Sequence, residues 1–256
     1  DQVADGRWIL APDVDEHMVW YGQPSRSFSN LIHDLEAEAA DALYAIMVDM
    51  YADKILGEHL FSRGSLADTF RLFDDPKLAS SDIWMERGAN GFLDRWPTPS
   101  MSVVGGMRQR LMDMRSGSAK AKKLGRSLFG HLSDHRSKGS KIARRFTKQS
   151  ADLPTIGLTK VPLVKWRRGL RFYGGAHCLN QEVTLATERA ALLHYPVTRG
   201  AEGLHHVVSR GQHTKNSSYY KALLEVAEIN PTFYGTRELR SLDDLNGIIQ
   251  PPRRPT

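Results

Sequence analysis

A short apolar stretch that runs directly into acidic residues constrains the fold more than any other feature of the chain. The segment from Trp8 to Pro12 is almost entirely apolar, and Asp13, Asp15 and Glu16 follow it within four residues. A run of this kind predicts a buried strand that ends in carboxylates. Ligands bind at the carboxyl ends of strands in open α/β sheets, so these acidic side chains are expected beside a binding site.

The spacing of Asp13 and Asp15 favours a cation site over acid–base catalysis by the pair. Two carboxylates this close together cannot flank a substrate bond as general acid and general base. They are well placed to hold a hard divalent cation, Mn²⁺ or Mg²⁺, that also touches phosphate oxygens. D-x-D also occurs by chance in many soluble proteins, so surface carboxylates after a strand remain an alternative for the motif alone.

The composition is that of a soluble globular protein without a disulfide framework. The 256-residue chain is 41% hydrophobic and 25% charged, and Cys178 is its single cysteine. No apolar run approaches the roughly 20 residues that span a bilayer. We therefore expect one domain over residues 1–256, a reducing compartment and a cytoplasmic location.

Positive charge is concentrated in residues 115–150, which are rich in Ser, Gly and Lys. Between Arg115 and Lys148 there are eleven Lys or Arg residues and one acid, Asp134, and without this segment the net charge of +6 becomes −4. We interpret the segment as a mobile basic insertion within the domain. A solvated loop, peripheral contact with the anionic inner face of the cell membrane, and nucleic-acid binding remain open. No readout motif accompanies the charge, so a nucleic-acid partner is not expected.

Hydrophobic periodicity predicts alternating strands and helices. A strand, a helix and a second strand follow one another from the start of the chain, which indicates a βαβ unit and a mainly parallel α/β sheet with flanking helices. Ser27 or Ser29 is expected to cap the first helix. The predicted strands are 7–12, 42–50, 102–111, 160–166 and 189–195, and a further helix is predicted over 217–229.

Seven segments in order resemble a bacterial branch of the family 2 glycosyltransferases. They are ADGRWILAPDVDEHMVW, ALYAIMVDMYAD, VVGGMRQRLM, LTKVPLVKWRRGLRFYGGAHCL, RAALLHYPV, SRGQHTKNSSYYKAL and LRSLDDLNGII, which cover most of the chain outside residues 115–150. The resemblance implies a GT-A, Rossmann-like fold. It also implies transfer of a sugar from a nucleotide-sugar donor to a glycan or lipid-linked acceptor of the cell envelope or of an exopolysaccharide. Only twelve residues precede Asp13, so the N-terminal βαβ portion of that fold is expected to be missing.

The resemblance implies a metal site at the D-x-D motif. Asp13 and Asp15 would hold the Mn²⁺ or Mg²⁺ ion that bridges the donor diphosphate. His194 ends an apolar strand and is a third candidate ligand, because imidazole suits manganese and such enzymes commonly add a late histidine. A buried histidine satisfied by a backbone carbonyl is the alternative. The chain departs from the family at Pro196, where a lysine usually stands.

Carboxylates are the candidates for catalysis. An inverting transferase needs a carboxylate base near the acceptor hydroxyl. Asp49, near the end of the predicted strand 42–50, is the first choice, with Asp53 and Glu86 behind it. Glu16 is expected to orient the acceptor or to support the metal ligands. A solvated loop acid is the competing interpretation of Asp49.

Four further residues are candidates for substrate binding. Arg108, Arg110 and Lys160 could pair with the diphosphate, and both arginines would share one face of the predicted strand 102–111. His177 follows a Gly-Gly pair and is a candidate for contact with phosphate, an acceptor hydroxyl or the metal. Plain loop or edge positions remain the alternative for each.

Overall fold

A ten-residue strand, β3 (Ala42–Tyr51), forms the centre of the fold. Its sequence is almost entirely apolar, and all ten residues are buried. β5 (Thr159–Lys165) and β8 (Ala190–His194) flank it on its two sides. A strand covered on both faces carries such a continuous apolar run, so the strand predicted at 42–50 is confirmed.

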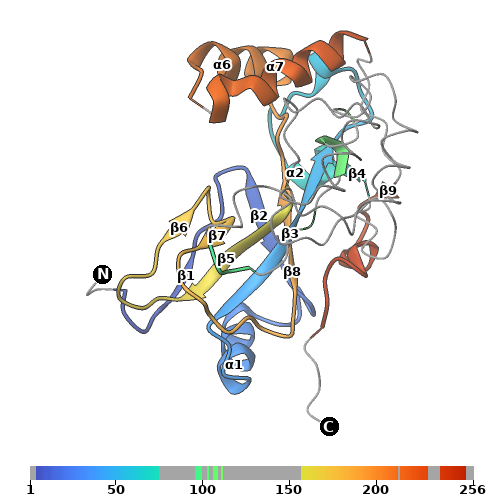
Figure 1. Cartoon of the computed structure of the whole chain (residues 1–256). Helices are drawn as coiled ribbons and strands as arrows, with labels where there is room; N and C mark the ends of the chain where they lie inside the picture. The colour runs from blue at the N-terminus through green and yellow to red at the C-terminus, as the bar shows by residue number, and fades with distance from the viewer. Residues whose placement is uncertain are drawn as a thin grey trace, which may run out of the picture.

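The computed structural model describes residues 4–74, 96–99, 103, 106–108, 111, 157–212, 214–229 and 237–251. These residues form an α/β fold in which few helices accompany a mixed sheet (Figure 1). The basic segment 115–150 and Arg110 lie outside the described residues, so the expectations for them stay predictions.

Seven strands form the main sheet. Its central order is β1 (Trp8–Leu10), β5, β3, β8 and β2 (Glu16–Val19), while β4 (Leu72–Phe73) and β9 (Arg237–Glu238) continue from the end of β3. A separate hairpin pairs β6 (Phe172–Tyr173) with β7 (Cys178–Leu179).

The prediction of a mainly parallel sheet is wrong. β3 and β8 are parallel, whereas the other strand pairs of the described sheet are antiparallel. β5 lies between β1 and β3, so the expected strand–helix–strand unit does not place its two strands side by side. A continuous apolar run reports burial on both faces but says nothing about the direction of the neighbouring strands. The general α/β class therefore holds.

The main sheet curls so that its two edge strands approach each other. β1 and β2 are separated by four strand spacings of about 4.8 Å, or roughly 19 Å across a flat sheet. Residues 11–15 connect them, and the six Cα–Cα steps from Leu10 to Glu16 span at most about 21 Å when fully extended. A turn in which the Glu16 N–H donates to the Asp13 carbonyl at 3.1 Å shortens this reach. The connection therefore fits only a curved sheet.

The helices cover two places on the sheet. α1 (Phe28–Ala37) buries Leu31 and Leu35, and the Ser27 side chain caps it by accepting from the Asn30 N–H. α6 (Gly200–Arg210) and α7 (Thr214–Ile229) lie side by side near the carboxyl end of β3 (Figure 1). Short turns of helix are α2 (Leu66–Thr69), η1 (Leu56–Glu58) and η4 (Leu242–Leu245). Among the helices the structure describes, none is long and apolar enough to cross a membrane.

The strand predicted at 102–111 is wrong in its described part. Residues 106–108 and 111 are helical, and Val103 makes an isolated β-bridge. Met107 and Leu111 are both fully buried and lie four residues apart, which is the period of a helix face. Arg108 therefore lies in a helical segment and not on a strand.

Candidate functional site

Polar side chains from four strands meet at one end of the sheet. β3 and β8 are parallel, so their carboxyl ends coincide, and Asp49 is the register partner of His194. β2 and β5 run in the opposite direction, and their first residues bring Glu16 and Lys160 to the same end. β1 also runs toward this end, so the acidic turn after it arrives there.

Backbone hydrogen bonds fix the turn at residues 11–15 between β5 and β8. The Ala11 N–H donates to the Pro162 carbonyl at 2.7 Å, and the Tyr195 N–H donates to the Asp15 carbonyl at 2.9 Å. The Glu16 carboxylate also accepts from the Asp13 N–H at 2.9 Å. The acidic residues of the motif are therefore held by the sheet itself.

Lys160 lies beneath the acidic turn as a buried cation. Its Nζ is 2.5 Å from Asp13 Oδ2 and 2.5 Å from Glu16 Oε1. The side chains of Lys160 and Glu16 are each 1% exposed, whereas that of Asp13 is 52% exposed. The ammonium that was expected to meet a diphosphate is therefore committed to two carboxylates of its own chain, and Glu16 serves to hold the turn.

A glycine from the β6–β7 hairpin packs directly against Asp13. Gly175 has a φ of +68°, and a Cβ placed on it would lie 3.0 Å from Asp13 Oδ2. The turn thus needs glycine both for its backbone conformation and for the space beside the carboxylate. The Gly-Gly pair noted in the sequence serves this close approach.

His177 faces the first residues of β5. Its Nδ1 lies 2.7 Å from the Thr159 carbonyl, to which the Nδ1–H donates. Burial, and then the charge of Lys160, lower the pKa of His177 to about 4, so the ring is neutral at pH 7. The neighbouring Cys178 is buried, and burial raises the pKa of its thiol to about 12. Neither residue is therefore charged at neutral pH.

A buried network orients His194. Its Nδ1 lies 2.8 Å from Asp49 Oδ1, and Arg108 Nε donates to the two Asp49 oxygens at 2.8 and 2.9 Å. Although burial raises the pKa of Asp49, Arg108 and His194 outweigh it and hold that pKa well below its ordinary value. Burial and Arg108 lower the pKa of His194, but its contacts with Asp15 and Asp49 give a net rise.

These contacts revise the roles expected for two residues. Asp49 is only 2% exposed and is held as an anion by Arg108, so it is a poor base for an acceptor hydroxyl. It is placed instead to orient His194. The Arg108 guanidinium is also buried and lies 6.0 Å from the centroid of the Tyr219 ring, so it is not presented to a diphosphate. Burial raises the pKa of Tyr219 well above its ordinary value.

Asp15 is the exposed member of the cluster, and it contacts the buried His194. Asp15 Oδ2 lies 3.4 Å from His194 Nε2, and the Asp15 side chain is 44% exposed. Burial raises the pKa of Asp15, but the hydrogen bond and charge of His194 give a net lowering. Within the described ranges, no group of three or more His, Cys, Asp or Glu residues has metal-binding geometry. The Asp15 carboxylate and the His194 imidazole, two possible cation donors, are thus in contact with each other.

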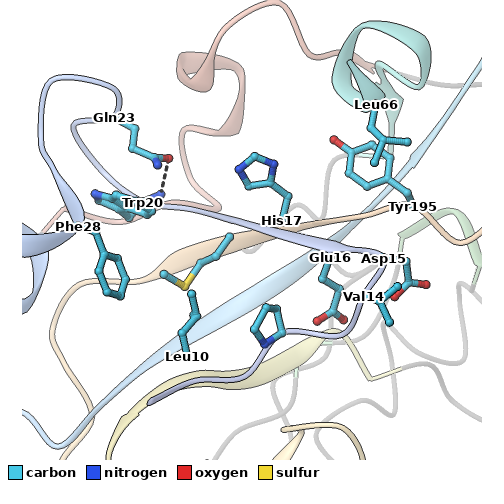
Figure 2. A pocket seen from close by; sticks show the side chains of 12 residues that line it. Leu10, Val14, Asp15, Glu16, His17, Trp20, Gln23, Phe28, Leu66 and Tyr195 are labelled. Carbon is cyan, nitrogen blue, oxygen red and sulfur yellow. Dashed lines mark hydrogen bonds between the residues drawn. The ribbon is translucent and has the colours of Figure 1, made fainter. Parts of the chain in front are cut away.

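A pocket of about 490 Å³ opens beside the acidic turn. Figure 2 shows Asp15 and Glu16 near one end of it and Trp20 and Phe28 near the other. Eight of its lining residues are apolar or aromatic and four are polar, a combination suited to a ligand with an apolar face and a few polar groups. The lining residues are Leu10, Pro12, Val14, Asp15, Glu16, His17, Met18, Trp20, Gln23, Phe28, Leu66 and Tyr195.

Sequence reasoning missed two residues of this region. Tyr219 sits against Arg108, and Tyr195 lines the pocket with a buried side chain. Tyr195 follows His194 directly, so its position beside the candidate histidine was a signal that could have been used. Nothing in the sequence placed Tyr219 near Arg108.

Comparisons with protein-family models, with curated proteins and with solved structures found no match to this chain. The resemblance to the family 2 glycosyltransferases therefore stays a prediction from the sequence.

Proposed function

We propose that the protein is a metal-dependent glycosyltransferase that moves a sugar from a nucleotide-sugar donor to a glycan or lipid-linked acceptor. The observation that carries the proposal is the contact, at 3.4 Å, between the exposed Asp15 carboxylate and His194 Nε2 at the end of the sheet. The D-x-D resemblance of the sequence supplies the class of reaction. A GT-A-like fold belongs to the same proposal.

The donor atoms suit a cation that the substrate helps to hold. Mg²⁺ is typically bound through one or two carboxylates together with substrate phosphates and water, and not by a complete protein cage. Asp15 supplies one carboxylate and His194 an imidazole nitrogen, which manganese accepts. When bound, the cation neutralises the charge that develops on the leaving nucleoside diphosphate.

The surrounding residues prepare these two donors. The Asp49 carboxylate accepts the Nδ1–H of His194, which leaves Nε2 turned toward Asp15. Arg108 keeps Asp49 ionised in its buried position. The adjoining pocket offers apolar and aromatic surface for part of an acceptor (Figure 2). In this account Asp13 and Glu16 shape the turn and Asp49 positions the histidine.

The proposal is tested by following nucleoside diphosphate release from UDP-glucose, UDP-N-acetylglucosamine and GDP-mannose with Mn²⁺. Hydrolysis by water reports donor activation even when the acceptor is unknown. We expect release from at least one donor by the wild-type chain, and at least a tenfold loss in Asp15→Asn and in His194→Gln. Glu58→Gln, which alters an exposed acid of η1, is the matched control. Equal rates in all four proteins would contradict the assignment.

A further inference from the structure

Lys160 occupies the place where the acidic turn could otherwise bind a metal ion. Its ammonium lies at 2.5 Å from both Asp13 Oδ2 and Glu16 Oε1. These two carboxylates come from a turn whose sequence, D-x-D-E, predicts a cation site. In the structure, the Lys160 ammonium takes the place of such a cation.

The ion pair between Lys160 and Glu16 is buried within the turn. The side chains of Lys160 and Glu16 are each 1% exposed, so neither charge is solvated by water. A buried charge needs a partner, because removing one member leaves the other uncompensated in a medium of low polarity. Lys160 and Glu16 therefore hold each other in the turn.

A divalent ion cannot share this position with the ammonium. Two cations within a few ångströms repel each other strongly where water is excluded. Asp13 is half exposed, but its Oδ2 is engaged by Lys160, and Gly175 packs close to both of its carboxylate oxygens. Asp15 points instead to His194, and within the described part of the chain no ion pair joins Asp15 to Lys160.

We propose that Lys160 is an internal cation that replaces a metal ion between Asp13 and Glu16, so that the site takes one divalent ion, at Asp15 and His194, and not two. The inference deepens the proposed function, on which its Asp15–His194 part rests. The Lys160 part stands on the ion pairs alone. It predicts that the acidic turn is formed before any metal binds.

The test compares Mn²⁺ stoichiometry and melting temperature in wild type, Lys160→Gln and the double variant Lys160→Gln/Glu16→Gln. Titration followed by electron paramagnetic resonance counts bound ions. We expect Lys160→Gln to bind one more Mn²⁺ per chain than wild type. We also expect saturating Mn²⁺ to raise the melting temperature of this variant by roughly 5 °C or more beyond the wild-type rise.

The double variant provides the control, because it removes both charges and should lose the added ion. If Lys160→Gln gains no ion and no metal-dependent stabilisation, the inference is overturned. If Lys160→Gln unfolds without metal, refolding by Mn²⁺ supports the inference and failure to refold in saturating Mn²⁺ contradicts it. A different result would contradict the proposed function: an Asp15→Asn variant that binds Mn²⁺ with the wild-type stoichiometry and binds nucleotide as the wild type does.

Discussion

Individual buried charges explain the geometry of the site better than the exposed carboxylates do. Asp49, Arg108 and His194 form one network, and Lys160 forms another with Glu16. In each network a buried charge is matched by a partner of the opposite sign. Asp49, Arg108 and Lys160, three of the residues expected to act on the substrate, contact charged side chains of their own chain.

Replacing Asp49 by Asn should destabilise the protein by about 3 kcal/mol, because the buried Arg108 charge loses its partner. Urea unfolding of the wild type and the variant measures the difference. Asp34→Asn is the matched control, because Asp34 pairs with Arg26 but its side chain is 46% exposed. That control should cost about 1 kcal/mol or less. A similar loss in both variants would contradict the network described for Asp49.

His177 should make the stability of the protein fall as the pH falls. Its pKa is about 4 in the folded chain and 6.5 ordinarily, so the unfolded chain binds more protons between these values. The free energy of unfolding is therefore unaffected by the titration of His177 above pH 6.5. It falls by about 3 kcal/mol as the pH drops from there to 4.

The measurement is the unfolding free energy at pH 7 and pH 4 for wild type and His177→Asn. The asparagine amide can still donate to the Thr159 carbonyl but does not titrate. We expect the variant to lose about 3 kcal/mol less than the wild type over this interval. Identical losses would show that His177 is not held neutral.

At the level of elements, apolar patterns predicted which segments form helices or strands and which of them are buried. They did not predict the direction in which neighbouring strands run. The run at 42–50 predicted β3 nearly at its observed bounds, and a cap at Ser27 was among the two predicted for α1. Strand pairing depends on contacts between distant segments, so the antiparallel order around β3 had no local signal. At 102–111 a strand was predicted, although Met107 and Leu111 already had helical spacing.

Capping of α1 is assigned to Ser27 and not to Ser29. The Ser27 hydroxyl accepts from the Asn30 N–H at 3.2 Å, whereas Ser29 lies exposed in the first turn. Ser27→Ala should therefore cost about 1 kcal/mol of stability. Ser29→Ala should be neutral or slightly stabilising, because alanine favours helix. Chemical denaturation of both variants tests this, and an equal effect would refute the assignment.

The β6–β7 hairpin should tolerate no side chain at Gly175. An alanine there would adopt a positive φ of +68° and meet Asp13 Oδ2 at 3.0 Å. We expect Gly175→Ala to cost about 1–3 kcal/mol. Gly57→Ala is the control, because nothing lies within 4 Å of its Cβ position, and it should be neutral or stabilising. Thermal and urea unfolding measure both, and a neutral Gly175→Ala would show that the turn can move from Asp13.

At the scale of the whole molecule, the site depends on the pairing of distant strands. Asp15, Asp49 and His194 are far apart in the sequence and meet because β8 pairs with both β2 and β3, so that His194 is the register partner of Glu16 and of Asp49. The sequence indicated each of these residues separately, through its place at the end of an apolar run. It did not show that Asp49 would be buried against Arg108 or that Lys160 would pair with the acidic turn, because such contacts appear only when the strands are assembled.

Calorimetric titration of UDP and GDP, with and without Mn²⁺, is the most direct test of the Asp15–His194 site. We expect binding of at least one nucleotide that is stronger by at least tenfold with Mn²⁺, and loss of that gain in Asp15→Asn and His194→Gln. Glu58→Gln should bind as the wild type does. Absence of nucleotide binding by the folded wild-type chain, or binding that ignores both Mn²⁺ and the Asp15 substitution, would contradict it.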